Sequence, residues 1–412
     1  MTSTETSSAP QSLSTDHSRA TADSAHSHGT GASGVQGSRA DRISSFDLNV
    51  IEVPSGREEE WRFSPVSRIA PLYNHALAGT AGVTVQAAEG VLVDTVQRTD
   101  ERLGKAGVPG DRTAVTAWNA FTEATIVTIP KEVVAPGATH ISVQGQADIA
   151  QAAHVLIKAE PLSESVVVLD HTGDALLTET VEIVAEDGAH LTVVSVQDWN
   201  EGAVHASSQR ITLGRDATVK HVVVTLGGDV VRVTPDAEFT AEGGSVEMVG
   251  LYFADENQHQ EHRLFVDHAV PNCKSRVTYK GALQGEGAHA VWVGDVLIRA
   301  AAEGTDTYEL NRNLVLTDGA RADSVPNLEI ETGEIEGAGH ASATGRFDDE
   351  QLFYLQSRGI PEADARRLVV RGFFAELIQE IGVPEVEDRL IAAIEEELEK
   401  SMSVITGVNN NS

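Results

Sequence analysis

The feature that most constrains this sequence is a change of period between about residues 125 and 345. Segments such as "TIVTIP", "SVVVLD", "LTVVSV" and "VKHVVVTL" alternate over two residues and are rich in Val, Ile and Thr. β-Branched residues at this period are typical of β-strands. Only 5% of the residues are aromatic and 36 are glycines, so turns must be frequent. The sequence therefore predicts a mainly β fold.

A short motif recurs within this stretch at a spacing of 28 residues. The motifs "EDGA", "GRDA" and "EGGS" end in small residues at Ala189, Ala217 and Ser245. A fixed repeat of strand and turn is typical of a solenoid, because one coil cannot bury its inner face alone. We predict a right-handed parallel β-helix. On these residues alone, a β-sandwich or jelly roll remains the alternative.

Composition divides the chain into four regions. Residues 1–45 are Ser, Thr, Gly, Ala and His with few large apolar side chains, which predicts a disordered tail. Residues 46–123, with "REEEW" and "DRTAVTAWNAFTEA", predict a mostly helical region with a few strands near "GVTVQAAEGVLVDTV". We assign 124–346 to the β-helix core and 347–405 to a C-terminal helical region.

The C-terminal region carries the clearest helical patterns. The segment "DDEQLFYLQSRG" ends at Gly359, a favourable position after a helix, and Pro361 can open the next helix. Apolar residues then step by four along each of two helices, at Val369, Phe373, Leu377 and Ile381 and at Leu390, Ile394 and Leu398. We expect part of this stripe to pack on the β-helix and part to contact a partner.

Charge and missing motifs exclude several functions. The net charge of −32 repels nucleic acid and anionic membranes, so neither is expected as a primary partner. The N-terminus has no signal-peptide pattern, and no apolar run is long enough to span a bilayer. The single cysteine, Cys273, fits a reducing compartment, and we predict a cytoplasmic protein. Although His268 is near in sequence, Cys273 is interpreted as a buried structural residue.

Several motifs together resemble the SufB/SufD family of iron–sulfur cluster assembly proteins. They are "REEEWRF", "QRITLGRDATVKHVVVTLGG", "VDHAVPNCKSRVTYKGAL" and "PNLEIETGEIEGAGHASATGRFDDEQLFYLQSRGI", in this order over about residues 55–400. The turn "GHASATGRFDD" is similar to the SufD branch, with His340, Gly345 and Asp348 at its characteristic positions. Many SufD proteins carry a cysteine where this chain has Ala338, so any role of that thiol is absent.

The resemblance implies a scaffold subunit rather than an enzyme. It implies a β-helix flanked by helices, a heterodimer with a SufB-like subunit and docking of a SufC-like ABC ATPase. Sulfur-donor proteins are a further partner class. The chain has no G-x-x-x-x-G-K-[ST] motif, so we expect ATP to bind the partner and not this chain.

The resemblance also implies candidate site residues. His340 is a candidate ligand for iron or a nascent iron–sulfur cluster, bound transiently and shared with SufB, because a single histidine cannot hold a cluster. The candidate ATPase dock comprises Arg358, Phe373, Phe374, Leu377 and Leu398, with Leu398 expected to be exposed.

Two other functions stay open at this point. One is a cytoplasmic β-helix adaptor that binds no metal. The other is a polysaccharide-acting β-helix enzyme, which would be expected to carry a signal peptide, aromatic sugar platforms and paired carboxylates in a groove. The first two of these features are absent from the sequence.

Overall fold

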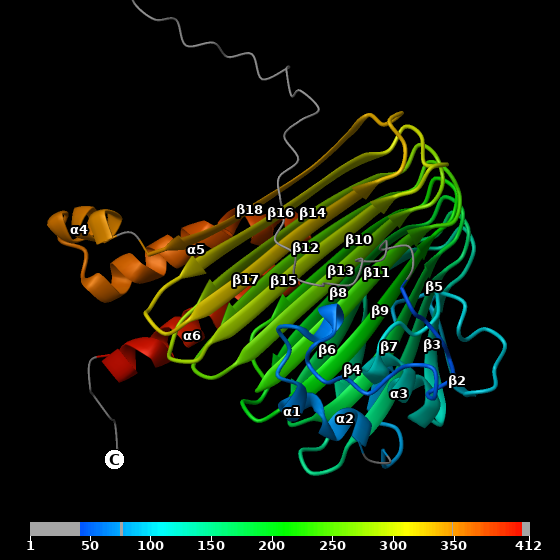
Figure 1. Ribbon diagram of the computed structural model, residues 1–412, viewed down its shortest axis with the longest axis horizontal. Coiled ribbons are helices and arrows are strands. Elements are labelled where there is room, and N and C mark those ends of the chain that lie inside the picture. The colour runs from blue at the N-terminus through cyan, green and yellow to red at the C-terminus, as the bar shows by residue number, and fades with distance from the viewer. Residues whose placement is uncertain (1–41, 75–76, 348, 406–412) are drawn as a thin grey trace, which may run out of the picture. The chain divides into compact units, whose positions relative to one another are not determined.

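A computed structural model describes residues 42–74, 77–347 and 349–405. The predicted disordered tail therefore lies outside the described residues, apart from residues 42–45. Strands, which run in parallel and stack along one direction, are the most abundant elements of the described residues (Figure 1). None of the described helices is long and apolar enough to cross a membrane.

The strands form two nine-stranded sheets, and from β3 onward successive strands of the chain alternate between the two. The first sheet consists, in spatial order, of β1 (Gly82–Gln86), β4 (Val134–Gln144), β6 (Glu164–Gly173), β8 (His190–Trp199), β10 (Thr218–Thr225), β12 (Ser245–Ala254), β14 (Lys274–Leu283), β16 (Asp306–Val315) and β18 (Gly337–Arg346). The second consists of β2 (Leu92–Gln97), β3 (Glu123–Ile129), β5 (Gln151–Ala159), β7 (Leu176–Ala185), β9 (Val204–Leu213), β11 (Val230–Phe239), β13 (His259–His268), β15 (His289–Ile298) and β17 (Arg321–Ile330).

This alternation makes each coil from one strand of each sheet. Neighbouring strands are parallel except at the pairs β1–β4 and β2–β3, which are antiparallel. The chain is thus a β-solenoid of about eight turns with helices at its ends, which confirms the predicted β-helix. The alternative sandwich or jelly roll is excluded by the parallel pairing.

The recurring sequence motif marks the same turn in successive coils. Gly188, Asp216 and Gly243 all have positive φ, at 67°, 54° and 84°, a conformation that Gly and Asp tolerate. The 28-residue spacing holds for the first step, because Thr218 pairs with His190. It is wrong by one residue for the second, because Ser245 pairs with Thr218 and not with Ala217. The stretch from the start of β10 to the start of β11 is two residues shorter than that from β8 to β9, and the stretch from β11 to β12 is one residue longer than that from β9 to β10.

The interior of the solenoid is filled by every second residue of each strand. Val, Ile, Leu and Ala dominate, and two tyrosines lie directly over glycines of neighbouring strands. Gly250 pairs with Tyr279, and Gly281 pairs with Tyr252. A Cβ atom at Gly281 would lie 1.8 Å from the Tyr252 ring, so glycine is required there for the ring to fit.

The N-terminal region covers the outer face of the second sheet. Its helical elements are short: η2 (Glu59–Trp61), α1 (Val66–Ile69), α2 (Pro71–Asn74) and α3 (Arg112–Ala120). Asp111 caps α3 by accepting a hydrogen bond from the Ala114 amide at 2.8 Å. Trp61 packs over the Arg232 guanidinium at 4.2 Å. The expected strands are β1 and β2, so the region contains less helix than the sequence suggested.

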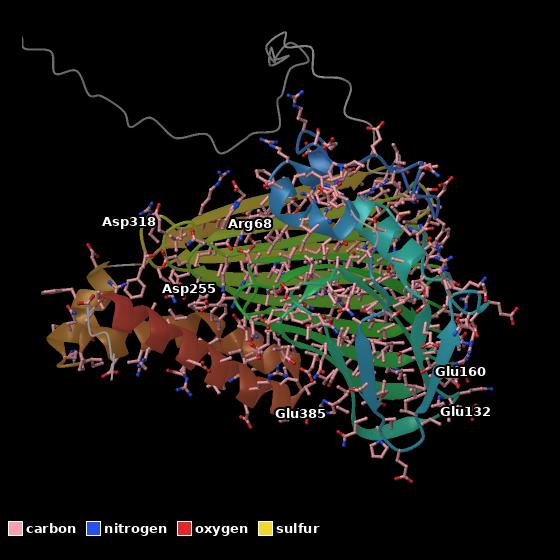
Figure 2. The ribbon with its side chains drawn as sticks, turned by 90° about the horizontal axis from the view of Figure 1, so that it is seen from below. Arg68, Glu132, Glu160, Asp255, Asp318 and Glu385 are labelled. Carbon is pink, nitrogen blue, oxygen red and sulfur yellow. The ribbon has the colours of Figure 1, made fainter. Side chains whose placement is uncertain are left out.

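Three helices follow the last strand: α4 (Asp349–Ser357), α5 (Glu362–Ile381) and α6 (Pro384–Ile405). Helices α5 and α6 lie along the outer face of the first sheet, on the side away from the N-terminal helices (Figure 2). Their apolar stripe packs on valines and leucines of strands β8, β10 and β12. Gly359 and Gly382 adopt positive φ at the ends of α4 and α5, as the helix-ending role of glycine requires.

Candidate functional site at the open end of the solenoid

The last coil of the solenoid ends in two long unpaired strand edges. Among the described residues, β17 pairs only with β15 and β18 only with β16, and each edge strand has ten residues. The exposed Asp318, labelled in Figure 2, lies in the turn before β17 and pairs with Arg346 of β18 at 2.6 Å. We refer to β17 and β18 as the terminal coil.

Along the free edge of β18, the N–H and C=O groups of every second residue point away from the solenoid. Gly337 and Phe347 donate their N–H groups to carbonyls of the preceding coil, at Thr305 and Val315. Because donors alternate along a parallel strand, odd-numbered residues bond to β16 and the N–H and C=O groups of even-numbered residues point outward. His340 and Ser342 therefore offer unpaired backbone groups to an added strand.

The same even-numbered residues face the interior of the last coil. Ser342 Oγ lies 3.0 Å from Ser324 Oγ of β17, and Thr344 accepts a hydrogen bond from Asn313 at 3.3 Å. No later coil within the described part of the chain covers them, and His340, Ser342 and Thr344 are exposed. The terminal coil thus exposes residue positions that every earlier coil buries.

A hydrogen-bonded chain lies beneath this surface. Tyr252 donates to Asn313, and Asn311 donates to the Tyr252 hydroxyl at 3.0 Å. Ser324 then donates to Asn311 at 2.8 Å. Buried polar groups that satisfy one another hold their side chains in one arrangement. The floor of the open end is therefore polar and fixed, whereas the interior nearer β1 is apolar.

His340 has an acidic neighbour that sequence reasoning missed. Its Cα pairs in register with that of Glu309 on β16, so both side chains extend from the same face. Glu309 is 1% exposed, and among the described residues neither carboxyl oxygen has a hydrogen-bond partner. Burial, with a smaller contribution from Asp295, raises the pKa of Glu309 to about 8. The alternation in "TYELNRNLV" was the available signal, since it places Glu309 inward with Asn311.

A carboxyl and an imidazole on adjacent strands can bind a borderline metal ion. At neutral pH Glu309 holds a proton, and a nearby cation would favour its release. Imidazole and carboxylate are both ligands that divalent iron accepts. Two donors leave coordination positions open, which a second chain at the free edge could fill.

Four of the five residues of the predicted ATPase dock are not exposed, and the expected exposure of Leu398 is wrong. Phe374, Leu377 and Leu398 are 0%, 0% and 4% exposed and belong to the cluster between the C-terminal helices and the first sheet. Phe373 is partly buried against the same cluster, and only Arg358 of the five is exposed. The stripe is wide because a sheet face, rather than solvent or a partner, covers it.

Apolar residues are exposed instead on α4 and on the first half of α5. Phe353 is 72% exposed, Tyr354 57% and Leu368 50%. Arg358 lies over the Tyr354 ring at 5.2 Å and donates to its hydroxyl at 3.1 Å. Large exposed apolar side chains in a group are typical of interaction surfaces. The structure thus leaves Arg358 in a surface that can bind a partner, with different neighbours.

Cys273 is buried, as expected, at the turn before β14. Its Sγ lies 3.4 Å from the Pro271 carbonyl, and burial raises the pKa of the thiol. His268 is hydrogen-bonded elsewhere, to the Ser275 hydroxyl at 2.9 Å. Among the described residues, neither belongs to a group of three or more side chains that could hold a metal ion.

Comparisons with known proteins agree with this geometry. The SufBD core domain of the SUF system for iron–sulfur cluster assembly matches residues 141–373. An iron–sulfur cluster assembly SufBD family protein of Mycobacterium tuberculosis is 56% identical over 89% of this chain and 94% of its own length. A second SufBD family protein of that organism is 27% identical, over 51% of this chain and 25% of its own. The iron–sulfur cluster assembly protein SufD of Escherichia coli is 29% identical, over 53% and 51%.

Proposed function

Since the chain belongs to the SufBD family of iron–sulfur cluster assembly proteins, we propose that it is a SufD-like scaffold subunit of a cluster assembly complex. In this role it catalyses no reaction itself and works in the cytoplasm. The observation that carries the proposal is the terminal coil. Two unpaired ten-residue edges and an exposed inner face are a template for a second solenoid.

The partner we propose is a second, different SufBD chain of the SufB type. This chain matches two different SufBD family proteins of Mycobacterium tuberculosis, one at 56% identity and one at 27%. Two chains that diverge this far within one organism can hold distinct positions in one complex. A strand of the partner would pair with β18 and continue the sheet.

His340 and Glu309 would then contribute to a shared iron or cluster site. His340 lies on the edge strand itself, so its imidazole would stand at the junction of the two chains. The iron or nascent cluster is the cargo of the complex, and its other ligands would come from the partner. A carboxyl that releases its proton only when a cation arrives suits a transient site.

The surface of α4 is the proposed dock for a SufC-like ATPase. Phe353, Tyr354 and Arg358 are exposed together on the helix that directly follows the terminal coil. An ATPase bound there would act next to the junction of the two solenoids. Phe353→Asp combined with Arg358→Glu should therefore weaken ATPase binding without loss of the β-sheet circular dichroism signal.

Ser342→Pro tests the pairing of the two solenoids. Proline removes the outward N–H of Ser342 and places its ring in the path of an added strand, whereas the odd-numbered donors to β16 are kept. We expect at least about tenfold weaker binding to the SufB-like chain, measured by co-purification and interferometry. Ser342→Ala is the matched control, because it removes the hydroxyl but keeps the N–H.

Equal partner binding by Ser342→Pro and Ser342→Ala would refute pairing at this edge. Both variants should unfold at nearly the same denaturant concentration as the unaltered chain, since Ser342 is exposed. Family membership favours the scaffold role over the polysaccharide-acting enzyme. A metal-free adaptor would bind the partner normally and yet be indifferent to loss of His340.

A further inference from the structure

Two histidines and a glutamate meet inside the solenoid, in strands remote from the terminal coil. His171 lies on β6, Glu179 on β7 and His205 on β9, and all three are 0% exposed. One side-chain nitrogen of each histidine and one oxygen of Glu179 lie within 4.8 Å of one another. His171 Nε2 is 2.9 Å from Glu179 Oε1, and His205 Nε2 is 3.7 Å from the same oxygen.

The other polar atoms of these side chains are anchored by their surroundings. Gln197 Oε1 accepts a hydrogen bond from the Trp199 indole at 3.0 Å, and an indole N–H can only donate. The same oxygen lies 2.8 Å from His205 Nδ1, closer than the 3.2 Å that separates Nδ1 from the Trp199 indole nitrogen, which favours the tautomer with the proton on Nδ1. His171 Nδ1 lies 3.1 Å from the Val196 carbonyl. Anchoring of the second ring nitrogen is characteristic of metal-ligating histidines.

His205 Nε2 is left with a lone pair and no hydrogen-bond partner among the described residues. It points toward Glu179 Oε1, which is also an acceptor. Other buried histidines, among them His221 and His268, also have one ring nitrogen without a partner among the described residues, so the distinguishing observation at His205 is the approach of Nε2 to the Glu179 carboxylate. Two acceptors that face each other without a donor between them are stabilised when a cation lies there.

Burial and neighbouring groups act on the ionisation of Glu179 and His205. Burial opposes ionisation of Glu179, but His171, His205 and the hydrogen bond from Ser207 at 2.7 Å outweigh it and lower its pKa to about 2. Burial lowers the pKa of His205 to about 3.

We propose that His171, Glu179 and His205 form a buried binding site for a divalent first-row metal ion, Fe²⁺ or Zn²⁺. Two imidazoles and a carboxylate form a donor set common to both ions. In a tetrahedral site with bonds of about 2.1 Å, donors lie about 3.4 Å apart, between the two separations observed here. The Ser207 hydroxyl is placed to complete or orient the set. The preference for iron rests on the proposed function, whereas the site itself does not.

The test uses the full chain alone. It is unfolded with chelator, refolded with Zn²⁺, Co²⁺ or anaerobic Fe²⁺, and passed through a column containing EDTA before elemental analysis. Because the site is enclosed, a bound ion should resist the chelator while the protein stays folded. Glu179→Gln removes the anionic oxygen, and His205→Asn removes Nε2 but keeps an anchor to Gln197. The control is His154→Gln, which alters another buried His–Glu pair, with Glu182 at 2.8 Å.

The unaltered chain should retain about one ion, and Co²⁺ should give the visible absorption of histidine ligation. Each ligand variant should retain at least about tenfold less, whereas His154→Gln and His340→Ala should retain the full amount. Loss of all three ions by the unaltered chain would overturn the proposal, and so would retention by a folded ligand variant. If a ligand variant does not fold, the proposal is tested by the ion retention and the cobalt spectrum of the unaltered chain. Complex formation is not measured, so failure here leaves the scaffold role intact.

Discussion

Phe374→Ala should detach the C-terminal helices from the solenoid. Phe374 is 0% exposed and lies in α5, which packs on strands β12 and β14. Loss of the buried ring costs about 2–3 kcal/mol in transfer free energy. The cavity left between a helix and a sheet raises the total to about 3–5 kcal/mol. We expect α5 and α6 to unfold at lower denaturant than the solenoid.

The tryptophans make this separation measurable. The chain contains four, Trp61, Trp118, Trp199 and Trp292, and all precede the C-terminal helices. Tryptophan fluorescence therefore reports the solenoid and the N-terminal region, whereas circular dichroism at 222 nm also reports α5 and α6. In Phe374→Ala the dichroism transition should begin at lower urea than the fluorescence transition.

Phe353→Ala is the matched control, because its ring is 72% exposed and the change should cost less than about 0.5 kcal/mol. Unfolding of Phe374→Ala within 1 kcal/mol of the unaltered chain, with coincident transitions, would refute the packing argument. The same packing explains why a change at Leu398 would test helix docking on the sheet rather than ATPase binding.

Three further changes probe the interior and the terminal coil. Burial lowers the pKa of His262 to about 3. The neutral ring therefore stabilises the fold fully above pH 6.5, the pKa of an unfolded histidine, and this stabilisation is lost as the pH falls. The free energy of unfolding should fall by about 2–3 kcal/mol by pH 4.5, and by less in His262→Gln. A steeper acid loss in His262→Gln would contradict this. Gly281→Ala should cost more than about 2 kcal/mol in urea unfolding, because its Cβ meets the Tyr252 ring, whereas Gly337→Ala, with open space around it, should not. His340→Ala should leave stability and partner binding unchanged but reduce the cluster formed on the reconstituted complex; normal iron and sulfide content would make His340 only an edge residue.

The fold type could be predicted from the sequence because its signals are local. Alternation of apolar residues defines a strand regardless of its neighbours, and Gly188, Asp216 and Gly243 mark turns by a backbone preference of their own. The C-terminal helices and the position of Gly359 at the end of α4 could be predicted for the same reason. The one-residue shortening of the coil between Thr218 and Ser245 could not, since one residue more or less leaves the local pattern intact.

The candidate sites were only partly predictable. His340 could be singled out from its motif, but the neighbouring Glu309 lies 31 residues earlier and is brought beside it by the length of one coil. An amphipathic stripe shows that a face is buried and not what buries it, so only the structure shows that Phe374 and Leu377 pack against the first sheet.

His171, Glu179 and His205 belong to three strands, and no spacing between them resembles a metal motif. Their convergence depends on how two sheets stack and on which face each residue takes. The sequence by itself therefore determined the type of coil, through backbone and side-chain preferences that act over a few residues. Only the tertiary structure decided which side chains meet, because contact between strands depends on the accumulated length of every turn between them.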